Sequence, residues 1–223
     1  MKLAFALVLG VLIALPAFGD CTTNQGAVVN ASIGIDGTFG AQGPCLAGSP
    51  GQPGNLIGFA FALNSCMNAA VERVKVQFQI AQAGDQWHHY LWRDQGGLPN
   101  DACGLECGAA TNLMITANGP TIQTYDWEES ACPCELVNGE RFYVGVIYAN
   151  VTTPADWAVG RNNIPVGAGN GFRNTTGNHG AWVELSTVGF GNRFAVEAVI
   201  GPDCGLVPVD PSTWGAVKSI YQQ

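Results

Sequence analysis

Phe142-Tyr143-Val144-Gly145-Val146-Ile147-Tyr148 is the stretch with the strongest preference for β structure in this chain. Aromatic and β-branched residues fit a pleated sheet, and an apolar run this short fits a strand better than a helix. Asn138-Gly139, just before it, is a dipeptide that favours a tight hairpin turn. The segment therefore predicts a buried strand that follows a turn.

A second segment has the alternation of a half-buried strand. Val74, Val76, Phe78 and Ile80 alternate with polar residues. Side chains on a strand point to opposite faces in turn, so one face is expected in a core and the other in solvent.

Other strand candidates lie between clusters of turn-forming residues. They are 27–33, 55–63, 87–93, 113–117, 121–127, 134–137, 181–185 and 193–200. The chain has 30 glycines, 12 prolines and only 12% charged residues. Many short strands separated by turns predict an all-β fold, an antiparallel β-sandwich or jelly roll over residues 20–200.

The first 19 residues have the order of a secretory signal peptide. Lys2 precedes an apolar run over 3–18, and the small residues Ala17 and Gly19 are placed for cleavage before Asp20. We therefore expect a secreted protein, extracellular or on the cell surface. A lipid anchor at Cys21 is the alternative, but Asp20 stands where a lipoprotein signal carries a small apolar residue.

The C-terminal residues do not have the strand pattern of the rest of the chain. Residues 201–211 are rich in proline and are expected to form a linker, and 212–223 to form a short amphipathic helix. Trp214, Val217 and Tyr221 would share one face of that helix. A helix this short is marginal by itself in water, so these three residues are predicted to dock.

The charge balance restricts the partners. Seventeen acidic residues against nine basic ones give a net charge of −8, which disfavours nucleic acid and anionic membranes. No second apolar run reaches the roughly 18 residues of a membrane helix. A glycan or a cell-surface protein is the expected partner, and no cofactor or metal is expected.

Eight cysteines in an exported chain predict disulfides. They are Cys21, Cys45, Cys66, Cys103, Cys107, Cys132, Cys134 and Cys204. The two tight clusters (103/107 and 132/134) suggest links between them, which would leave Cys45 with Cys66 and Cys21 with Cys204. Zinc held by the four clustered cysteines is the alternative, although their spacing does not match the usual C-x2-C pairs.

Two segments resemble known proteins. Residues 140–146 (Glu-Arg-Phe-Tyr-Val-Gly-Val) and 193–199 (Arg-Phe-Ala-Val-Glu-Ala-Val) resemble strands of secreted bacterial β-sandwich surface modules. Residues 212–221 resemble a terminal "Trp-Gly-x-x-Lys-x-x-Tyr" peptide of exported bacterial proteins, although this chain ends in Gln222-Gln223 where an arginine is expected. The resemblances imply a surface module with a docking or sorting tail, and they transfer no catalytic residue.

Candidates for catalysis are few. His88 and His89 are adjacent and would point to opposite faces of a strand, while His179 in a loop could meet one of them as a metal ligand or base. Carboxylates for a glycosidase pair are Asp126, Glu128, Glu129, Glu184 and Glu197, and turn residues Asp85, Asp94 and Asp101 could hold calcium. No G-x-S-x-G motif or phosphate-binding glycine loop is present.

The aromatic residues support a ligand-binding role better than the residues above support a catalytic one. Trp87, His89 and Trp127 are the candidate ligand-binding residues, because exposed rings beside polar groups can stack on sugars. The opposing expectation is that most large aromatics of a sandwich lie in its core. The sequence thus favours a non-catalytic structural or adhesive surface module. A carbohydrate-binding module is the first alternative and a secreted hydrolase the second.

Overall fold

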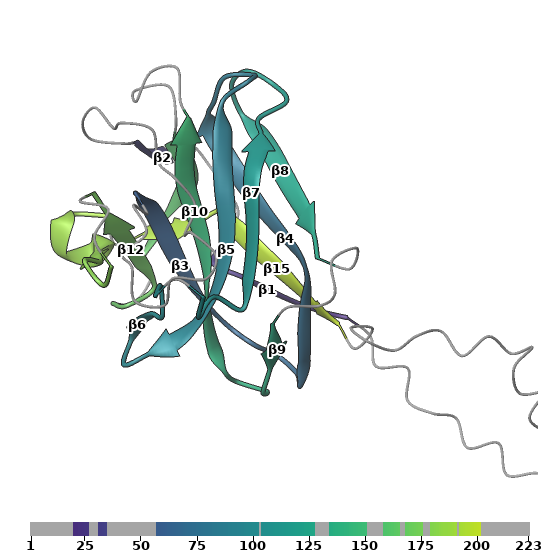
Figure 1. The fold of residues 1–223 in the computed structure, drawn as a ribbon. Helices are drawn as coiled ribbons and strands as arrows, with labels where there is room; N and C mark the ends of the chain where they lie inside the picture. Colours follow the sequence, from purple (N-terminus) through teal and green to yellow (C-terminus); the bar gives the residue numbers. More distant parts are fainter. Residues whose placement is uncertain are drawn as a thin grey trace, which may run out of the picture.

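The structure is a computed structural model that describes residues 20–26, 31–34, 57–102, 104–127, 134–150, 158–165, 168–175, 179–190 and 192–201. In these ranges the chain forms antiparallel strands and one 3₁₀ turn, η2 (Leu185–Val188). The predicted all-β antiparallel fold is confirmed, and its curled sheets fit a sandwich (Figure 1). The predicted signal peptide, nearly all of the linker and the C-terminal helix with Trp214, Val217 and Tyr221 lie outside the described residues.

One sheet is centred on β4 (Ala69–Ile80) and is called the β4 sheet below. Its strand order is β1 (Cys21–Asn24), β15 (Val196–Gly201), β4, β11 (Ala158–Pro165) and β14 (Asn192–Phe194). In addition, β2 (Ala31–Gly34) pairs with β11, and both β8 (Thr121–Asp126) and β9 (Glu135–Leu136) pair with β4.

The other sheet is the β10 sheet, after its central strand β10 (Arg141–Asn150). Its order is β13 (Val183–Glu184), β12 (Gly171–Asn174), β3 (Gly58–Asn64), β10, β5 (Gln86–Gln95) and β6 (Leu98–Pro99), with β7 (Gly108–Met114) also pairing with β5. In Figure 1 the β10 sheet lies in front of the β4 sheet.

Strand β4 behaves as its alternation predicts as far as Phe78, whereas Ile80 at its end is 40% exposed. Val74, Val76 and Phe78 are buried in the core between the sheets, while Lys75 and Gln77 between them remain partly exposed. The β4 sheet therefore has one apolar face in the core and one polar face in solvent.

The β10 sheet is instead buried on both faces. From β10, Phe142, Val144 and Val146 enter the core between the sheets. Tyr143 and Ile147 point the other way, into a second apolar cluster on the outer face of the sheet. That cluster contains Ala60, Ala62, Tyr90, Trp92, Tyr143, Ile147, Phe172 and Trp182.

Gly145 interrupts the apolar run of β10 for a steric reason. A Cβ at this position would overlap the indole ring of Trp92, which lies across the strand from β5. Trp92 in turn stacks on Tyr90, with ring centroids 5.3 Å apart. The absence of a side chain at Gly145 therefore provides the space for this aromatic stack.

The Asn138-Gly139 turn is formed, but the expected hairpin is not. Gly139 has a φ of 80°, and the amide of Glu140 donates to the carbonyl of Val137 at 2.8 Å. The turn connects β9, which pairs with β4, to β10 in the other sheet. It carries the chain across the sandwich because β10 finds its partners in β3 and β5.

Among the described residues, two disulfides lie at one end of the sandwich. Cys21 pairs with Cys66 (Cα–Cα 6.2 Å), so the predicted pairs Cys21–Cys204 and Cys45–Cys66 are wrong. The reason is that Cys21 lies opposite Ile200, which itself lies opposite Val71 near the start of β4, a few residues after Cys66. The spacing is within disulfide range.

The second disulfide agrees with the predicted link between the cysteine clusters. Cys107, before β7 of the β10 sheet, pairs with Cys134, before β9 of the β4 sheet, and their Cα atoms are 4.8 Å apart. This bond is incompatible with zinc on all four clustered cysteines. Cys45, Cys103, Cys132 and Cys204 lie outside the described residues.

Candidate functional site

The three aromatic site candidates are core residues. Trp87 is 2% exposed, His89 0% and Trp127 2%. Their side chains pack in the space between the sheets, where a sugar ring cannot reach them. The expectation that these rings face outward is therefore wrong, because β5 is covered on both faces and Trp127, just after β8, packs into the core between the sheets.

The contacts of His89 are those of a structural residue. Its Nδ1 lies 3.0 Å from the carbonyl oxygen of Gly145, which can only accept, so Nδ1 carries the proton. Its Nε2 then accepts from the indole Nε1 of Trp127 at 3.3 Å. Complete burial lowers the pKa of His89 to about 4, against an opposing effect of the Gly145 hydrogen bond. His89 is thus a neutral core histidine whose two nitrogens are both used.

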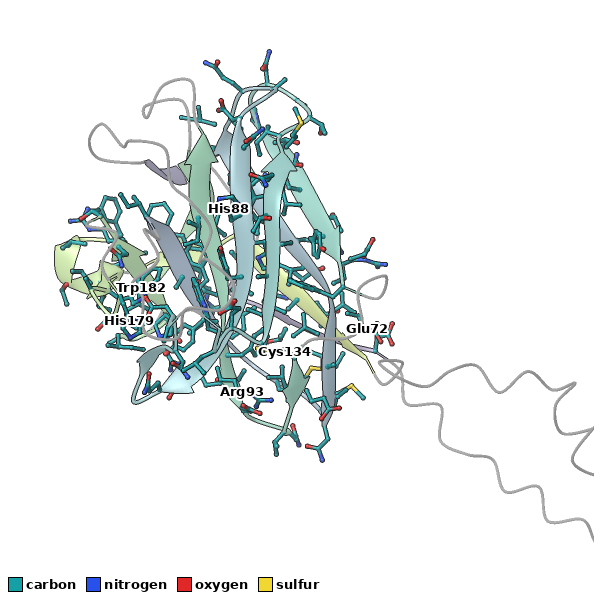
Figure 2. The ribbon with its side chains drawn as sticks, viewed as in Figure 1. Glu72, His88, Arg93, Cys134, His179 and Trp182 are labelled. Carbon is teal, nitrogen blue, oxygen red and sulfur yellow. A yellow bond between two sulfur atoms is a disulfide. The ribbon has the colours of Figure 1, made fainter. Side chains whose placement is uncertain are left out.

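The other histidines do not join it. His88 is buried, and its Nδ1 accepts from the amide of Asn112 at 3.0 Å. His179 lies well apart from His88, beside Trp182 (Figure 2). Among the residues that the structure describes, no group of three potential metal ligands comes together.

His179 instead pairs with a buried carboxylate. Its Nδ1 lies 2.5 Å from Oδ1 of Asp101; the histidine side chain is 43% exposed and that of Asp101 is 0% exposed. The same carboxylate accepts from the amide of Gly180 at 3.2 Å and from Nε1 of Trp182 at 2.7 Å. Asp101 therefore attaches residues 179–182 to the segment after β6, while the His179 side chain stays partly exposed.

Trp182 covers part of the outer cluster of the β10 sheet. Its ring meets Trp92 edge to face at a centroid distance of 5.6 Å. Figure 2 shows Trp182 and His179 together on the side of β12, far from Glu72 at the opposite edge. Residues 179–182, held by Asp101, are thus part of the cover that keeps the β10 sheet from solvent.

Among the described residues, the three candidate calcium ligands do not form one group. Asp85 is buried just before β5, and Asp94 and Asp101 have separate partners. Asp94 accepts from the hydroxyl of Tyr143 at 2.7 Å and from the amide of Gly97 at 3.1 Å. Burial, followed by this hydrogen bond, raises the pKa of Tyr143 above its ordinary value. Asp101 has the contacts described above, so these two carboxylates serve different parts of the fold.

The candidate glycosidase carboxylates also have partners within the protein. Asp126 pairs with Arg73, and Glu197 with Lys75 at 2.7 Å. Glu184 accepts from the hydroxyl of Ser186 and the amide of Gly169, which lower its pKa in that order of importance. Glu128 and Glu129 lie outside the described residues.

The outer side of the β4 sheet is the accessible polar surface, and we call it the open face. It is defined by Asn24, Arg73, Lys75, Gln77, Ile122, Asp126 and Glu197. The register pairs Lys75 with Glu197 on β15 and with Thr124 on β8, so the polar side chains form rows across the strands.

Two hollows, each of about 240 Å³, lie on either side of Asn24. The first is on the open face, and its lining includes Lys75, Gln77, Ile122, Ala195 and Glu197. The second lies where β1 meets the end of β3, and its lining includes Thr23, Gln25, Asn64, Asn170 and Arg193. The alternation of β4 predicted a polar face, but no local pattern indicated that β1 and Asn170 would adjoin it.

Comparisons with known proteins assign no family. No family model and no curated protein matches this chain. One similar solved structure is that of the cysteine protease and lectin-like domains of Cwp84, a surface layer associated protein of Clostridium difficile, with a TM-score of 0.46 and 12% identity over 67% of this chain and 32% of that one. Another is clostridial cysteine protease Cwp84 after propeptide cleavage, with a TM-score of 0.48 and 12% identity over 66% of this chain and 36% of that one.

This chain spans about a third of the length of those structures. A match with so low a sequence identity and TM-score gives the present protein neither an activity nor a ligand. In the part of the chain that the structure describes, no helix has the length and hydrophobicity needed to cross a membrane.

Proposed function

We propose that this chain is an exported, non-catalytic module with a structural or adhesive role outside the cell or on its surface. The observation that carries the proposal is the difference between the two outer faces. The β10 sheet is covered by its aromatic cluster, whereas the open face of the β4 sheet presents rows of polar side chains and a hollow. A rigid scaffold with one accessible face is suited to holding a surface partner.

The disulfides support the export that the proposal requires. Such bonds persist in oxidising compartments and are rare in reducing ones. By the chain-entropy model, closing loops of 45 and 27 residues stabilises a fold by roughly 3–4 kcal/mol each. The proposal includes the signal peptide, the jelly-roll topology and the helical tail expected from the sequence.

An adhesion experiment tests the role. Purified, oxidised protein is incubated with intact cells of the source strain and with their isolated envelopes, and the bound fraction is measured by sedimentation. We expect binding that is reduced when the open face carries the bulky variant Gln77→Trp and unchanged in Gln95→Trp, on an exposed part of β5. Equal binding of both variants would contradict adhesion through the open face.

The tail is tested separately. The sequence predicts that Trp214, Val217 and Tyr221 attach the module or assemble it. Deletion of residues 212–223 should then release the protein into the medium or dissociate its oligomers. If the shortened protein keeps its location and its assembly, the tail has no role in attachment, and the part of the proposal that concerns the open face still stands.

A secreted hydrolase is the second candidate, favoured by the His179–Asp101 pair. A half-exposed imidazole that is oriented by a buried carboxylate has the geometry of a general base. Hydrolysis of a panel of glycosides and esters by the full chain, abolished in His179→Gln, would establish this function. Equal background rates for both proteins would exclude it for those substrates.

A further inference from the structure

We propose that the two hollows beside Asn24 bind a neutral, hydroxyl-rich glycan chain, with adjacent sugar units on either side of that residue. The inference rests on the adhesive function proposed above and names its ligand class. Each hollow has a volume of about 240 Å³, somewhat below the roughly 300–1,000 Å³ of a site for a drug-sized molecule. Each is therefore a subsite for a small unit, and the two together fit a chain of such units.

The donors and acceptors of the lining suit hydroxyl groups. Asn24 is shared by the two hollows, Gln77 lies in the first, and Asn64 and Asn170 lie in the second. A primary amide offers both N–H donors and a carbonyl acceptor, so it can bond two neighbouring hydroxyls in complementary directions. Asn24 and Asn64 are exposed, so their binding requires no opening of the fold.

The second hollow has a well-ordered base. Gln25 is buried, and its Nε2 donates to the carbonyl oxygens of Ala62, at 2.9 Å, and Asn170. Its Oε1 accepts from the amide of Phe194 at 3.4 Å. These bonds fix β1 against β3 and β14, so the side chains that flank Gln25 are displayed by a preformed backbone, which reduces the ordering cost of binding.

The charges favour a neutral ligand. In the first hollow, the ammonium of Lys75 lies 2.7 Å from Glu197, and in the next row Arg73 pairs with Asp126. Each of these cations is thus matched by an anion, and the chain as a whole carries a charge of −8. Arg193, in the lining of the second hollow, is one further cation. A polyanion such as nucleic acid needs a broad unbalanced cationic surface, which this single residue and the paired rows do not provide.

The apolar content of the first hollow favours a sugar over a protein partner. Ile122 is 61% exposed, whereas the other two aliphatic residues of the lining, Ala195 and Val196, are buried, so Ile122 supplies one exposed apolar contact among polar side chains. A protein interface of standard size needs about 800 Å² per partner and a core enriched in aromatic residues. One aliphatic side chain amid amides instead matches a sugar ring, which has C–H groups on its face and hydroxyls at its rim.

Affinity electrophoresis of the full, oxidised chain tests the proposal. Native gels are cast with xyloglucan, galactomannan or mixed-linkage β-glucan as neutral probes and with polygalacturonate as an anionic one. The double variant Asn24→Ala/Gln77→Ala removes amides from both hollows. Gln95→Ala is the matched control, because it removes an exposed amide from β5, a strand that lines neither hollow. Thermal unfolding verifies that each variant is folded.

We expect retardation by at least one neutral polysaccharide, unaffected by salt, with at least tenfold weaker binding in the double variant and no change in the control. Retardation by no neutral probe, or by polygalacturonate alone at low salt, would overturn the inference. So would equal binding by the double variant. If the protein still sediments with cells, the adhesive function survives without this ligand; if it binds neither cells nor glycans, both proposals fail.

Discussion

Replacing Asp101 by alanine tests whether residues 179–182 depend on one buried carboxylate. The carboxylate has three donors: the amide of Gly180, Nδ1 of His179 and Nε1 of Trp182. Gly180 and His179 are exposed, so water can replace the carboxylate there. Trp182 is only 7% exposed, so its indole N–H would lose its partner inside the protein.

An unsatisfied buried donor costs about 1–3 kcal/mol. Loosening the edge-to-face contact between Trp182 and Trp92 adds about 0.5–1.5 kcal/mol. We therefore expect Asp101→Ala to lower the free energy of unfolding by about 3 kcal/mol, which corresponds to roughly 6–12 °C in Tm for a domain of this size.

The assay is thermal unfolding followed by near-ultraviolet circular dichroism and tryptophan fluorescence. Asp126→Ala is the control, since Asp126 pairs with Arg73 where both side chains are about 40% exposed, and an exposed ion pair contributes less than about 1 kcal/mol. A difference between the two variants of less than about 0.5 kcal/mol would show that Asp101 does not hold these residues.

Three further predictions concern the core and the disulfides. The unfolded state takes up a proton at the ordinary histidine pKa of 6.5, whereas folded His89 does so only near pH 4. Its contribution to the free energy of unfolding, about 3 kcal/mol, is therefore complete above pH 6.5 and lost as the pH falls to 4. Urea unfolding at several pH values measures this loss, and His89→Gln should abolish that part of the pH dependence. Gly145→Ala should cost about 1–3 kcal/mol by overpacking Trp92, measured against Thr124→Ala on the solvent side; equal stabilities would refute the steric account. Reduction of the disulfides should lower the midpoint of urea unfolding with little effect on far-ultraviolet circular dichroism below it, and an unchanged midpoint would contradict their stabilising role.

Local patterns predicted the strands, but not what covers them. The alternation around Val74 and Val76 predicted both faces of β4, because a half-buried strand reveals its orientation through its own side chains. The apolar run of β10 predicted burial, yet did not identify Phe172 and Trp182 as the residues that cover its outer side. That cover comes from residues that follow β10 in the sequence only after β11 has joined the other sheet, and strand periodicity carries no signal for such a contact.

The candidate site was harder to predict for the same reason. Trp87 and Trp127 satisfied the composition expected of a sugar-stacking site, but their burial depends on how the whole sandwich packs. Asp101 and His179 are 78 positions apart and have no shared motif. The polar alternation of Lys75 and Gln77 was the one local sign of the open face.

The position of Cys21 opposite Ile200 also determines how the domain responds to tension. Strand β1 enters, and β15 leaves, at the end of the sandwich that carries both disulfides. A load applied through Gly201 would peel β15 from β1 and β4 one hydrogen-bonded pair at a time, which is a mechanically weak direction. A load applied through Cys21 passes covalently to Cys66 before any strand can separate. Within the residues described, the module is thus held covalently where β1 begins and by hydrogen-bonded strand pairs where β15 ends.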